Sequence, residues 1–292
     1  MKQDPDVERI ALADGRMLAY RTYGEHRSGD VVVNCHGGLM DGRDVSLADA
    51  AARALGLRVL SPDRPGVGSS SPRPGRTILD WAGDVEQLVD RLGIPRFRAM
   101  GWSEGGQYAL ALAHRLADRV DGVAVIAGAL PLDDSTRFGE LNAVDRRLAT
   151  LAAHRPTLAR LYLGTTHAFA RLSPGATAGV SARALDPSDA AVVRANRRWF
   201  ARSLEGALAN RPGAIEEYRA FVKPWGFAPE DIRIPAHVYQ GGADRLIPAS
   251  WGEELASRLP VANLHRYPDE GHFIAVTRRD EVLADLYITA PR

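Results

Sequence analysis

Short runs of β-branched and apolar residues alternate with stretches of helical periodicity through most of this chain. The alternation is clearest at DVVVNCHGG, residues 30–38, which ends in glycines and is followed by apolar residues at helical spacing. Strand runs without polar alternation are buried on both faces, and strands separated by helices pair in parallel. The sequence therefore predicts an α/β protein with a mostly parallel central sheet and helices on both faces.

The order of these patterns divides the chain into a core and an insertion. Residues 7–12 and 17–23 flank the turn signal ADG and predict an antiparallel hairpin. From residue 132 to residue 230 the strand pattern disappears, and helix-compatible stretches broken by prolines replace it. We expect a core domain formed by residues 1–131 and 231–292, with an α-helical cap inserted after the sixth strand. A chain of 292 residues is long enough for both parts.

The composition limits the partners and the compartment. The net charge of +1 gives no general attraction to nucleic acid or to an anionic membrane, and no run approaches the roughly eighteen apolar residues of a membrane span. The one cysteine, Cys35, excludes an intramolecular disulfide, and the polar start MKQDPDVERI lacks the apolar core of a signal peptide. We therefore expect a cytoplasmic protein with a small-molecule substrate, as a monomer or a homodimer.

Ser103 lies between Gly101 and Gly105 in the run GWSEGG. In a tight strand-to-helix turn, a side chain at either glycine would collide with the neighbouring strand or helix, so the turn lifts the serine hydroxyl above the carboxyl edge of the sheet. A serine hydroxyl attacks a carbonyl only when a base removes its proton. The five-residue pattern alone also occurs by chance at structural turns. The apolar strand before it, the helix after it and an earlier HGG motif favour a nucleophile.

Two backbone N–H groups are candidates for stabilising negative charge near this hydroxyl. The turn at Ser103 directs the N–H of Glu104 and the start of a helix toward the site. A second N–H in such a turn comes from the loop after an earlier strand, which here carries HGG. We expect Gly38 and Glu104 to form an oxyanion hole, and His36 to organise its loop rather than to act as a base.

The motifs NCHGG, SPDRPGVGSS, GWSEGG, GGADRLIP and DEGHF follow one another along the chain. In this order they resemble the α/β-hydrolase family, from about residue 31 to the C-terminus and outside the insertion. The resemblance implies the fold of that family, with Asp244 as the catalytic acid and His272 as the catalytic base. Asp133 and Asp134, which follow the strand before the insertion, are an alternative position for the acid. The chain order Ser, Asp, His also agrees with the family.

General acid–base chemistry assigns the roles in such a triad. His272 accepts the Ser103 proton and returns it to the leaving group, while Asp244 fixes the imidazole tautomer and stabilises the imidazolium. The other histidines and acids fit structural roles better: His265 falls within a predicted strand, His114 within a helix, and His154, His167 and His237 lack a flanking loop signal. Asp63 fits a loop-bracing role, and Cys35 fits a buried strand position.

The spacing of potential ligands predicts neither a metal site nor a cofactor. The histidines and acids do not cluster in the sequence at ligand spacing, and zinc-type cysteine pairs are impossible with one cysteine.

A serine at the nucleophile position indicates acyl transfer rather than the alkyl-ester chemistry of relatives with aspartate there. We expect a serine hydrolase that cleaves a carboxylic ester of a small to medium, fairly apolar substrate through an acyl-enzyme. A thioesterase, a lactonase and a carbon–carbon bond hydrolase are compatible with the same triad. A prolyl aminopeptidase fits less well because Leu39-Met40 follows HGG where those relatives have Pro-Gly, although Glu205, Glu216 and Glu217 are candidates to anchor a substrate amine.

The predicted insertion is expected to form a lid over Ser103. Candidate pocket residues are Leu39, Trp199, Phe200, Trp225 and Phe227, and the four aromatic residues are equally compatible with a lid core. A hypothesis of another class is a non-catalytic ligand-binding protein on a hydrolase scaffold. The coexistence of a serine, an acid and a histidine at the triad positions counts against it, because binding alone would not require all three.

Overall fold

The computed structural model describes residues 5–132 and 135–288. Within these residues the strands form one eight-stranded sheet in the order β1-β2-β4-β3-β5-β6-β7-β8. The strands are β1 (Glu8–Ala11), β2 (Met17–Gly24), β3 (Val31–Cys35), β4 (Arg58–Pro62), β5 (Phe97–Trp102), β6 (Val120–Ile126), β7 (Ala236–Gly241) and β8 (Ala262–Tyr267).

The pairing of the strands agrees with the sequence patterns. The predicted hairpin is confirmed, since β1 pairs with β2 in antiparallel register, and β2 is also antiparallel to β4. The strands β4, β3, β5, β6, β7 and β8, in their order across the sheet, pair in parallel with one another, which places their carboxyl ends at one edge of the sheet.

Helices cover both faces of the sheet, because strands such as β3 present apolar side chains on each face. Val31 and Val33 pack into one buried apolar cluster and Val32 into another, as alternate residues of a strand must. The first cluster lies under α2 (Asp80–Arg91), α3 (Gly105–Arg115) and α11 (Ala249–Arg258). The second lies under α1 (Asp49–Ala54) and α13 (Arg279–Ile288), together with the short helices η1 (Asp44–Ala48) and α12 (Ile274–Thr277).

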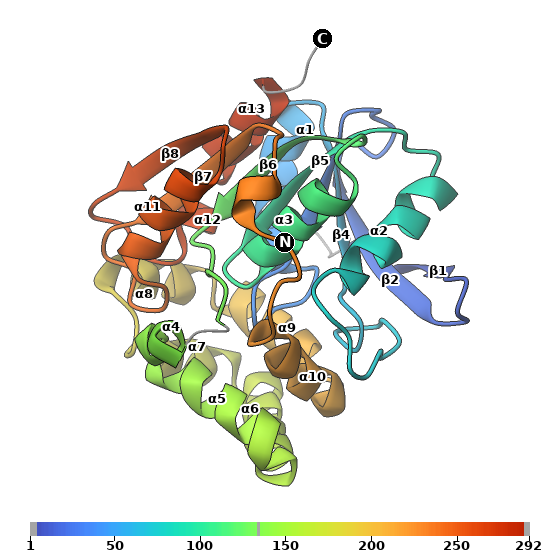
Figure 1. Ribbon diagram of the computed structural model, residues 1–292. Helices are drawn as coiled ribbons and strands as arrows, with labels where there is room; N and C mark the ends of the chain where they lie inside the picture. Colours follow the sequence, from blue (N-terminus) through green and yellow to red (C-terminus); the bar gives the residue numbers. More distant parts are fainter. Residues whose placement is uncertain (1–4, 133–134, 289–292) are drawn as a thin grey trace.

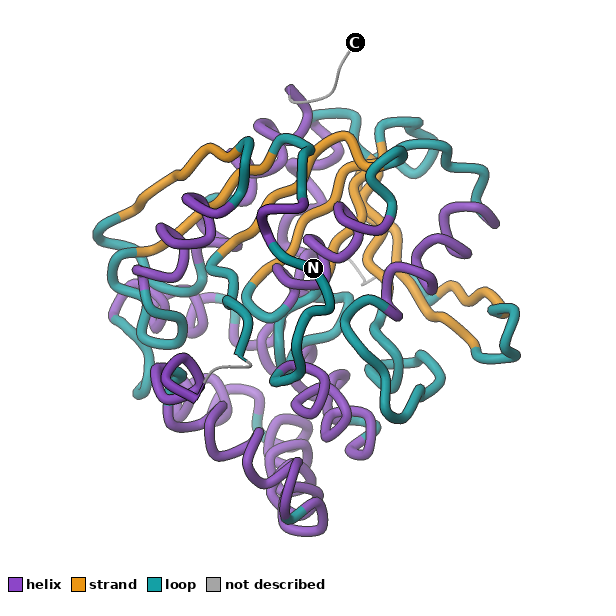
Figure 2. Tube along the Cα trace, viewed as in Figure 1, coloured by secondary structure: helices purple, strands orange, loops and turns teal. Residues whose placement is uncertain are grey.

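The segment between β6 and β7 is helical, as the sequence predicts. It contains α4 (Ser135–Glu140), α5 (Ala143–His154), α6 (Pro156–Leu172), α7 (Pro174–Ser181), α8 (Pro187–Ala195), α9 (Arg197–Leu208) and α10 (Arg211–Phe221), followed by the turn η2 (Pro229–Asp231). Figures 1 and 2 show most of these helices gathered at one end of the molecule, beyond the strands. We refer to α4–α10 as the helical segment. Asp133 and Asp134, the alternative acids, lie outside the described residues.

No helix within residues 5–132 and 135–288 combines the length and hydropathy that crossing a bilayer requires.

Candidate active site

Ser103 occupies a strained turn between β5 and α3. Its backbone φ is +56°, in the left-handed region that side chains other than glycine rarely adopt. A Cβ at Gly101 would lie 2.1 Å from the carbonyl oxygen of Gly105, and a Cβ at Gly105 would lie 2.0 Å from the carbonyl oxygen of Cys35. Both glycines are therefore required by close backbone approach, as predicted. Strain of this kind is characteristic of functional turns.

A hydrogen bond to the neighbouring strand β6 fixes this turn. The N–H of Ser103 donates to the carbonyl of Ile126 at the end of β6, at 2.8 Å. The side chain of Ser103 is half-buried, and no hydrogen bond of its hydroxyl to another described residue is present. Hydrogen bonds of a catalytic nucleophile are often long without substrate and shorten when substrate binds.

Asp244 and His272 lie in the loops after β7 and β8 and contact each other directly. Nδ1 of His272 lies 2.8 Å from Oδ2 of Asp244, and both side chains are almost completely buried. Oδ1 of Asp244 accepts the backbone N–H groups of Leu246 at 2.7 Å and Ile247 at 2.9 Å. These two bonds fix the carboxylate, so Oδ2 is presented to the imidazole.

The electrostatics of this pair favour a basic imidazole. Burial by itself lowers the pKa of His272, because a buried charge is poorly solvated. The charge of Asp244 and its hydrogen bond oppose this effect, with smaller contributions from Asp189 and Asp145, and the pKa of His272 ends above its ordinary value. His272 is therefore suited to take up a proton.

Trp102 links the serine turn to the histidine loop. Its Nε1 donates to the carbonyl of His272 at 2.9 Å, and its ring centroid lies 5.5 Å from the His272 ring. Because Trp102 directly precedes Ser103, these contacts bring the two loops together. The structure thus gathers the turn of Ser103, His272 and Asp244 at one edge of the sheet.

The two predicted oxyanion donors are neighbours. A Cβ at Gly38 would lie 2.8 Å from Oε2 of Glu104, so the missing side chain makes room for this carboxyl group. No hydrogen bond from the backbone N–H of Gly38 or Glu104 to another described residue is present, which leaves both groups available to a ligand. Burial raises the pKa of Glu104, although the charges of Arg64 and Arg76 oppose the shift.

His36 organises the loop of Gly38, as the sequence predicts. It is fully buried; its Nε2 accepts the N–H of Arg64 at 3.1 Å, and its Nδ1 lies 3.0 Å from the carbonyl of Gly37. Burial and the charge of Arg64 lower the pKa of His36 well below its ordinary value. A neutral histidine that uses both ring nitrogens within its loop has no role as a base.

Other structural assignments from the sequence are confirmed. Asp63 accepts the N–H groups of Gly42 and Ser69 and pairs with Arg21, so it braces its loop. Cys35 is fully buried at the end of β3, and burial raises the pKa of its thiol to about 12.

The aromatic candidates for the pocket separate into two groups. Trp199 stacks on Trp102 with ring centroids 6.5 Å apart, and Phe200 lies 6.1 Å from Phe273. Both therefore pack beside residues adjacent in sequence to Ser103 and His272. Leu39 is half-buried next to Gly38 and has a φ of +54°.

The other two aromatic residues are core residues rather than pocket walls. Trp225 is buried and donates from Nε1 to Oε1 of Gln107, at 2.9 Å. Phe227 stacks on His114 at the far end of α3, with centroids 4.9 Å apart. Their place in the insertion left a pocket wall and a core position open for Trp225 and Phe227, and their packing against α3 favours the core position.

Two of the three candidate amine anchors already have partners. The carboxylate of Glu217 in α10 is buried and pairs with the buried guanidinium groups of Arg64, at 2.6 Å, and Arg76. Glu216 accepts the N–H of Gly75 at 2.8 Å and pairs with Arg219. Neither carboxylate is therefore free to bind a substrate amine.

Asp189 is a site residue that sequence reasoning missed. This buried residue of α8 accepts the backbone N–H of His272 with one carboxylate oxygen and that of Phe273 with the other, each at 2.7 Å. Burial raises its pKa, while the two amide hydrogen bonds and the charge of His272 oppose the shift. Asp189 follows the helix N-cap Asp186 in the run DPSD, which by itself indicates only a helix start.

Potential metal ligands gather elsewhere. The sequence spacing predicts no metal site, but the fold brings His237, His265 and Asp285 together on β7, β8 and α13.

The mostly parallel sheet with helices on both faces and a helical segment after β6 is an α/β fold. The family model of the alpha/beta hydrolase fold matches residues 30–278, and the chain belongs to the α/β-hydrolase family. It is accordingly an enzyme, a hydrolase.

The chain is also similar to individual hydrolases and transferases of known name. The chain is 32% identical over 228 residues to a pimeloyl-[acyl-carrier protein] methyl ester esterase of Aromatoleum aromaticum, covering 74% of this chain and 81% of the relative. It is 31% identical over 169 residues to a homoserine O-acetyltransferase of Natronomonas pharaonis, covering 46% and 42%. Among solved structures, the enol-lactonase of Burkholderia xenovorans LB400 is similar in fold, with a TM-score of 0.75, 24% identity and coverage of 96% and 100%.

Proposed function

We propose that this protein is a serine hydrolase that cleaves a carboxylic ester of a small to medium, fairly apolar substrate through an acyl-enzyme. The observation that carries the proposal is the buried contact of 2.8 Å between His272 and Asp244, beside the strained turn of Ser103. A buried acid that orients an imidazole next to an elbow serine is the arrangement that activates a hydroxyl for acyl transfer.

The proposed reaction assigns one role to each group. His272 takes the proton of Ser103 through Nε2 as the hydroxyl oxygen attacks the ester carbonyl, and Asp244 stabilises the imidazolium through Nδ1. The N–H groups of Gly38 and Glu104 stabilise the tetrahedral oxyanion. His272 then protonates the leaving alcohol, which departs as the acyl-enzyme forms. Water, deprotonated by His272, releases the acid and restores Ser103.

The side chains near the triad favour an apolar substrate. Trp102, Trp199, Phe200 and Phe273 form a connected aromatic group beside His272. We propose that the helical segment acts as a cap and that Trp199 and Phe200, with Leu39, contact the acyl or alcohol part of the ester. The name of the relative from A. aromaticum, a methyl ester esterase, supports an ester substrate.

A lactone is an ester closed into a ring, and the enol-lactonase neighbour makes lactonase activity a specific variant of the same proposal. The prolyl aminopeptidase alternative loses two of its three candidate anchors, because Glu216 and Glu217 are engaged with other groups. Thioester and carbon–carbon bond cleavage fit the same triad, and the substrate panel compares thioesters directly with esters.

The test combines covalent labelling with a substrate panel. A fluorophosphonate is expected to label the wild-type protein at Ser103, and p-nitrophenyl esters of increasing chain length are expected to be hydrolysed faster than thioesters, or than proline and alanine anilides. Ser103→Ala should abolish labelling and reduce kcat by at least about 10⁴-fold. Ser250→Ala is the matched control, since Ser250 is exposed on α11.

Three outcomes would overturn this proposal. Labelling that persists in Ser103→Ala would place the nucleophile elsewhere, and a preference for anilides or thioesters would replace the ester assignment. A wild-type protein that binds esters but turns none over would support the ligand-binding hypothesis.

A further inference from the structure

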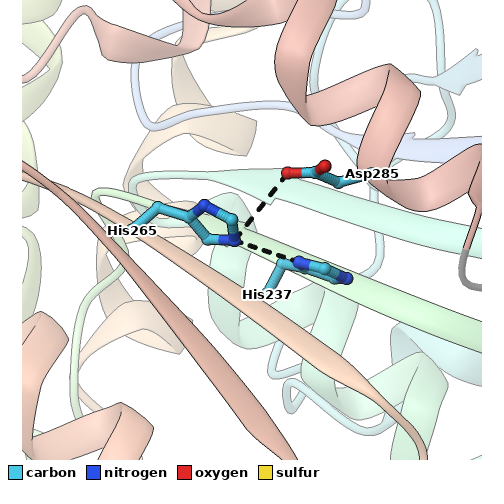
Figure 3. A group of neighbouring side chains, drawn as sticks. All are labelled: His237, His265 and Asp285. Carbon is cyan, nitrogen blue, oxygen red and sulfur yellow. Dashed lines mark hydrogen bonds and ion pairs between the residues drawn. The ribbon is translucent and has the colours of Figure 1, made fainter.

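A cluster of two histidines and one aspartate lies under α13, apart from the proposed triad. His237 and His265 come from the neighbouring strands β7 and β8, and Asp285 comes from the helix that covers them (Figure 3). His237 is the second residue of β7, whereas Asp244 follows the carboxyl end of that strand. The cluster therefore lies toward the opposite end of β7 from the triad.

The strand register explains how the two histidines meet. Tyr239 pairs directly with His265, and His237 is two residues before Tyr239, so all three side chains lie on the same face of the sheet. Asp285 faces them from the buried side of α13, where Leu286 and Val282 pack into the core. The three side chains thus come from three elements held in place by the core.

The potential ligand atoms lie at distances suited to one small cation. Nδ1 of His237 is 3.1 Å from Nε2 of His265, and Nε2 of His265 is 3.8 Å from Oδ2 of Asp285 (Figure 3). One ligand atom from each residue lies within 4.8 Å of the others. Ligands at about 2.1 Å from a tetrahedral metal are about 3.4 Å apart, so only small side-chain shifts separate this cluster from a coordinating arrangement.

Neighbouring groups orient the potential ligands. The hydroxyl of Tyr239 donates to Oδ2 of Asp285 at 2.7 Å, and the Tyr239 ring stacks on His265 with centroids 4.3 Å apart. Nδ1 of His265 faces Oε1 of Glu281 at 3.9 Å, one turn before Asp285 on α13. A carboxylate behind a histidine and a hydrogen bond to a carboxylate are the outer partners that metal ligands commonly have.

We infer that His237, His265 and Asp285 bind a divalent transition-metal ion of the zinc class. Two imidazole nitrogens with one carboxylate select such ions over Mg²⁺ and Ca²⁺, which prefer oxygen ligands. The side chains of His265 and Asp285 are 25% and 26% exposed, which gives the ion a route from solvent. Bound there, the ion would join α13 to β7 and β8 and stabilise the fold without taking part in ester cleavage.

The test is a titration of the metal-stripped full-length protein with Zn²⁺ alone, followed by calorimetry and thermal unfolding. We expect one ion per chain and a rise in Tm of roughly 5 °C at a free Zn²⁺ concentration of about 100 times Kd. His265→Gln and Asp285→Asn should each raise Kd by more than about tenfold and remove the Tm increase. Tyr239→Phe should weaken binding by roughly tenfold, because it removes the hydrogen bond that orients Asp285.

The control variant is His26→Gln, which alters an exposed histidine in the loop after β2. It should leave the affinity for Zn²⁺ unchanged. The inference is overturned if Zn²⁺ does not bind, or if it binds with the same Kd to His265→Gln and Asp285→Asn as to the wild type. Far-ultraviolet circular dichroism of each variant shows whether a variant that no longer binds Zn²⁺ is still folded.

Discussion

Two buried carboxylates attach the helical segment to the rest of the protein, and they bind partners of different kinds. Asp189 in α8 accepts two neutral backbone N–H groups, those of His272 and Phe273. Glu217 in α10 pairs with two buried guanidinium groups, those of Arg64 and Arg76. Loss of the first charge leaves amides with a weaker acceptor, whereas loss of the second leaves two cations uncompensated in the interior.

Because of this difference, we expect one carboxylate to matter most for the stability of the fold and the other for the position of His272. Arg64 also donates to the carbonyls of His36 and Gly37, so the pair with Glu217 supports the loop of Gly38 from behind. Asp189 instead holds the backbone that carries the proposed base. We expect Glu217 to dominate the stability of the attachment and Asp189 to dominate the position of His272.

The largest expected effect is on the free energy of unfolding. Glu217→Gln removes the charge that balances Arg64 and Arg76, and should lower this free energy by about 3–5 kcal/mol. Urea unfolding followed by tryptophan fluorescence measures the change. Glu216→Gln, one residue away and partly exposed, should cost less than about 1 kcal/mol. Equal losses in the two variants would contradict the role given to Glu217.

The second effect is on the catalytic rate. Asp189→Asn replaces one of the two acceptor oxygens by a donor, so the N–H of either His272 or Phe273 loses its partner. We expect kcat for a short p-nitrophenyl ester to fall about tenfold, which corresponds to about 1.4 kcal/mol, with little change in KM, because the imidazole is displaced and the pocket is not.

Asp186→Asn is the control for this rate effect. Asp186 caps the same helix α8 through the N–H of Ser188, and it reaches the histidine loop only indirectly, because it also accepts the Ser188 hydroxyl, which accepts the N–H of Gly271. Asparagine is an equally good cap and keeps the oxygen that accepts both bonds. A kcat of Asp189→Asn within twofold of that of Asp186→Asn would show that the contact with the histidine loop has no positioning role.

The smallest effect is a displacement of the pH profile. The charge of Asp189 contributes to the raised pKa of His272, so Asp189→Asn should lower that pKa. Because the proposed base must be neutral, kcat/KM falls as the pH drops through the pKa of His272. The acidic limb should therefore move to lower pH in Asp189→Asn. Glu217→Gln should leave this limb in place. An equal displacement in both variants would show that the electrostatic effect on His272 is not specific to Asp189.

The sequence predicted the elements and residues whose signals are local. The turn of Ser103 follows from two glycines at fixed positions, and its need for them is visible in the close approach of backbone atoms. The loops of Asp244 and His272 follow two segments that the sequence predicts as strands, and parallel pairing brings the ends of those strands to one edge of the sheet. The helical segment follows from the loss of the strand pattern.

Contacts between distant residues left no such signal. Helical periodicity shows which side chains of α10 are apolar, but it does not show that Arg64 lies opposite Glu217, 153 residues away. The same holds for Trp225, for which the insertion pattern left a pocket position and a core position open and which packs against Gln107. It also holds for His237, His265 and Asp285, which strand register and helix packing bring together.

The sequence by itself determined the sheet, its helical layers and the strained serine turn, because short-range sterics and hydrophobic periodicity encode them. The resemblance of its motifs to those of the α/β-hydrolase family supplied the acid and the histidine of the proposed triad. Only the tertiary structure decided which buried charges meet. Asp189 reaches the loop of His272 across 83 residues, and a hydrogen bond of 2.7 Å depends on the packing of whole elements rather than on any neighbouring residue.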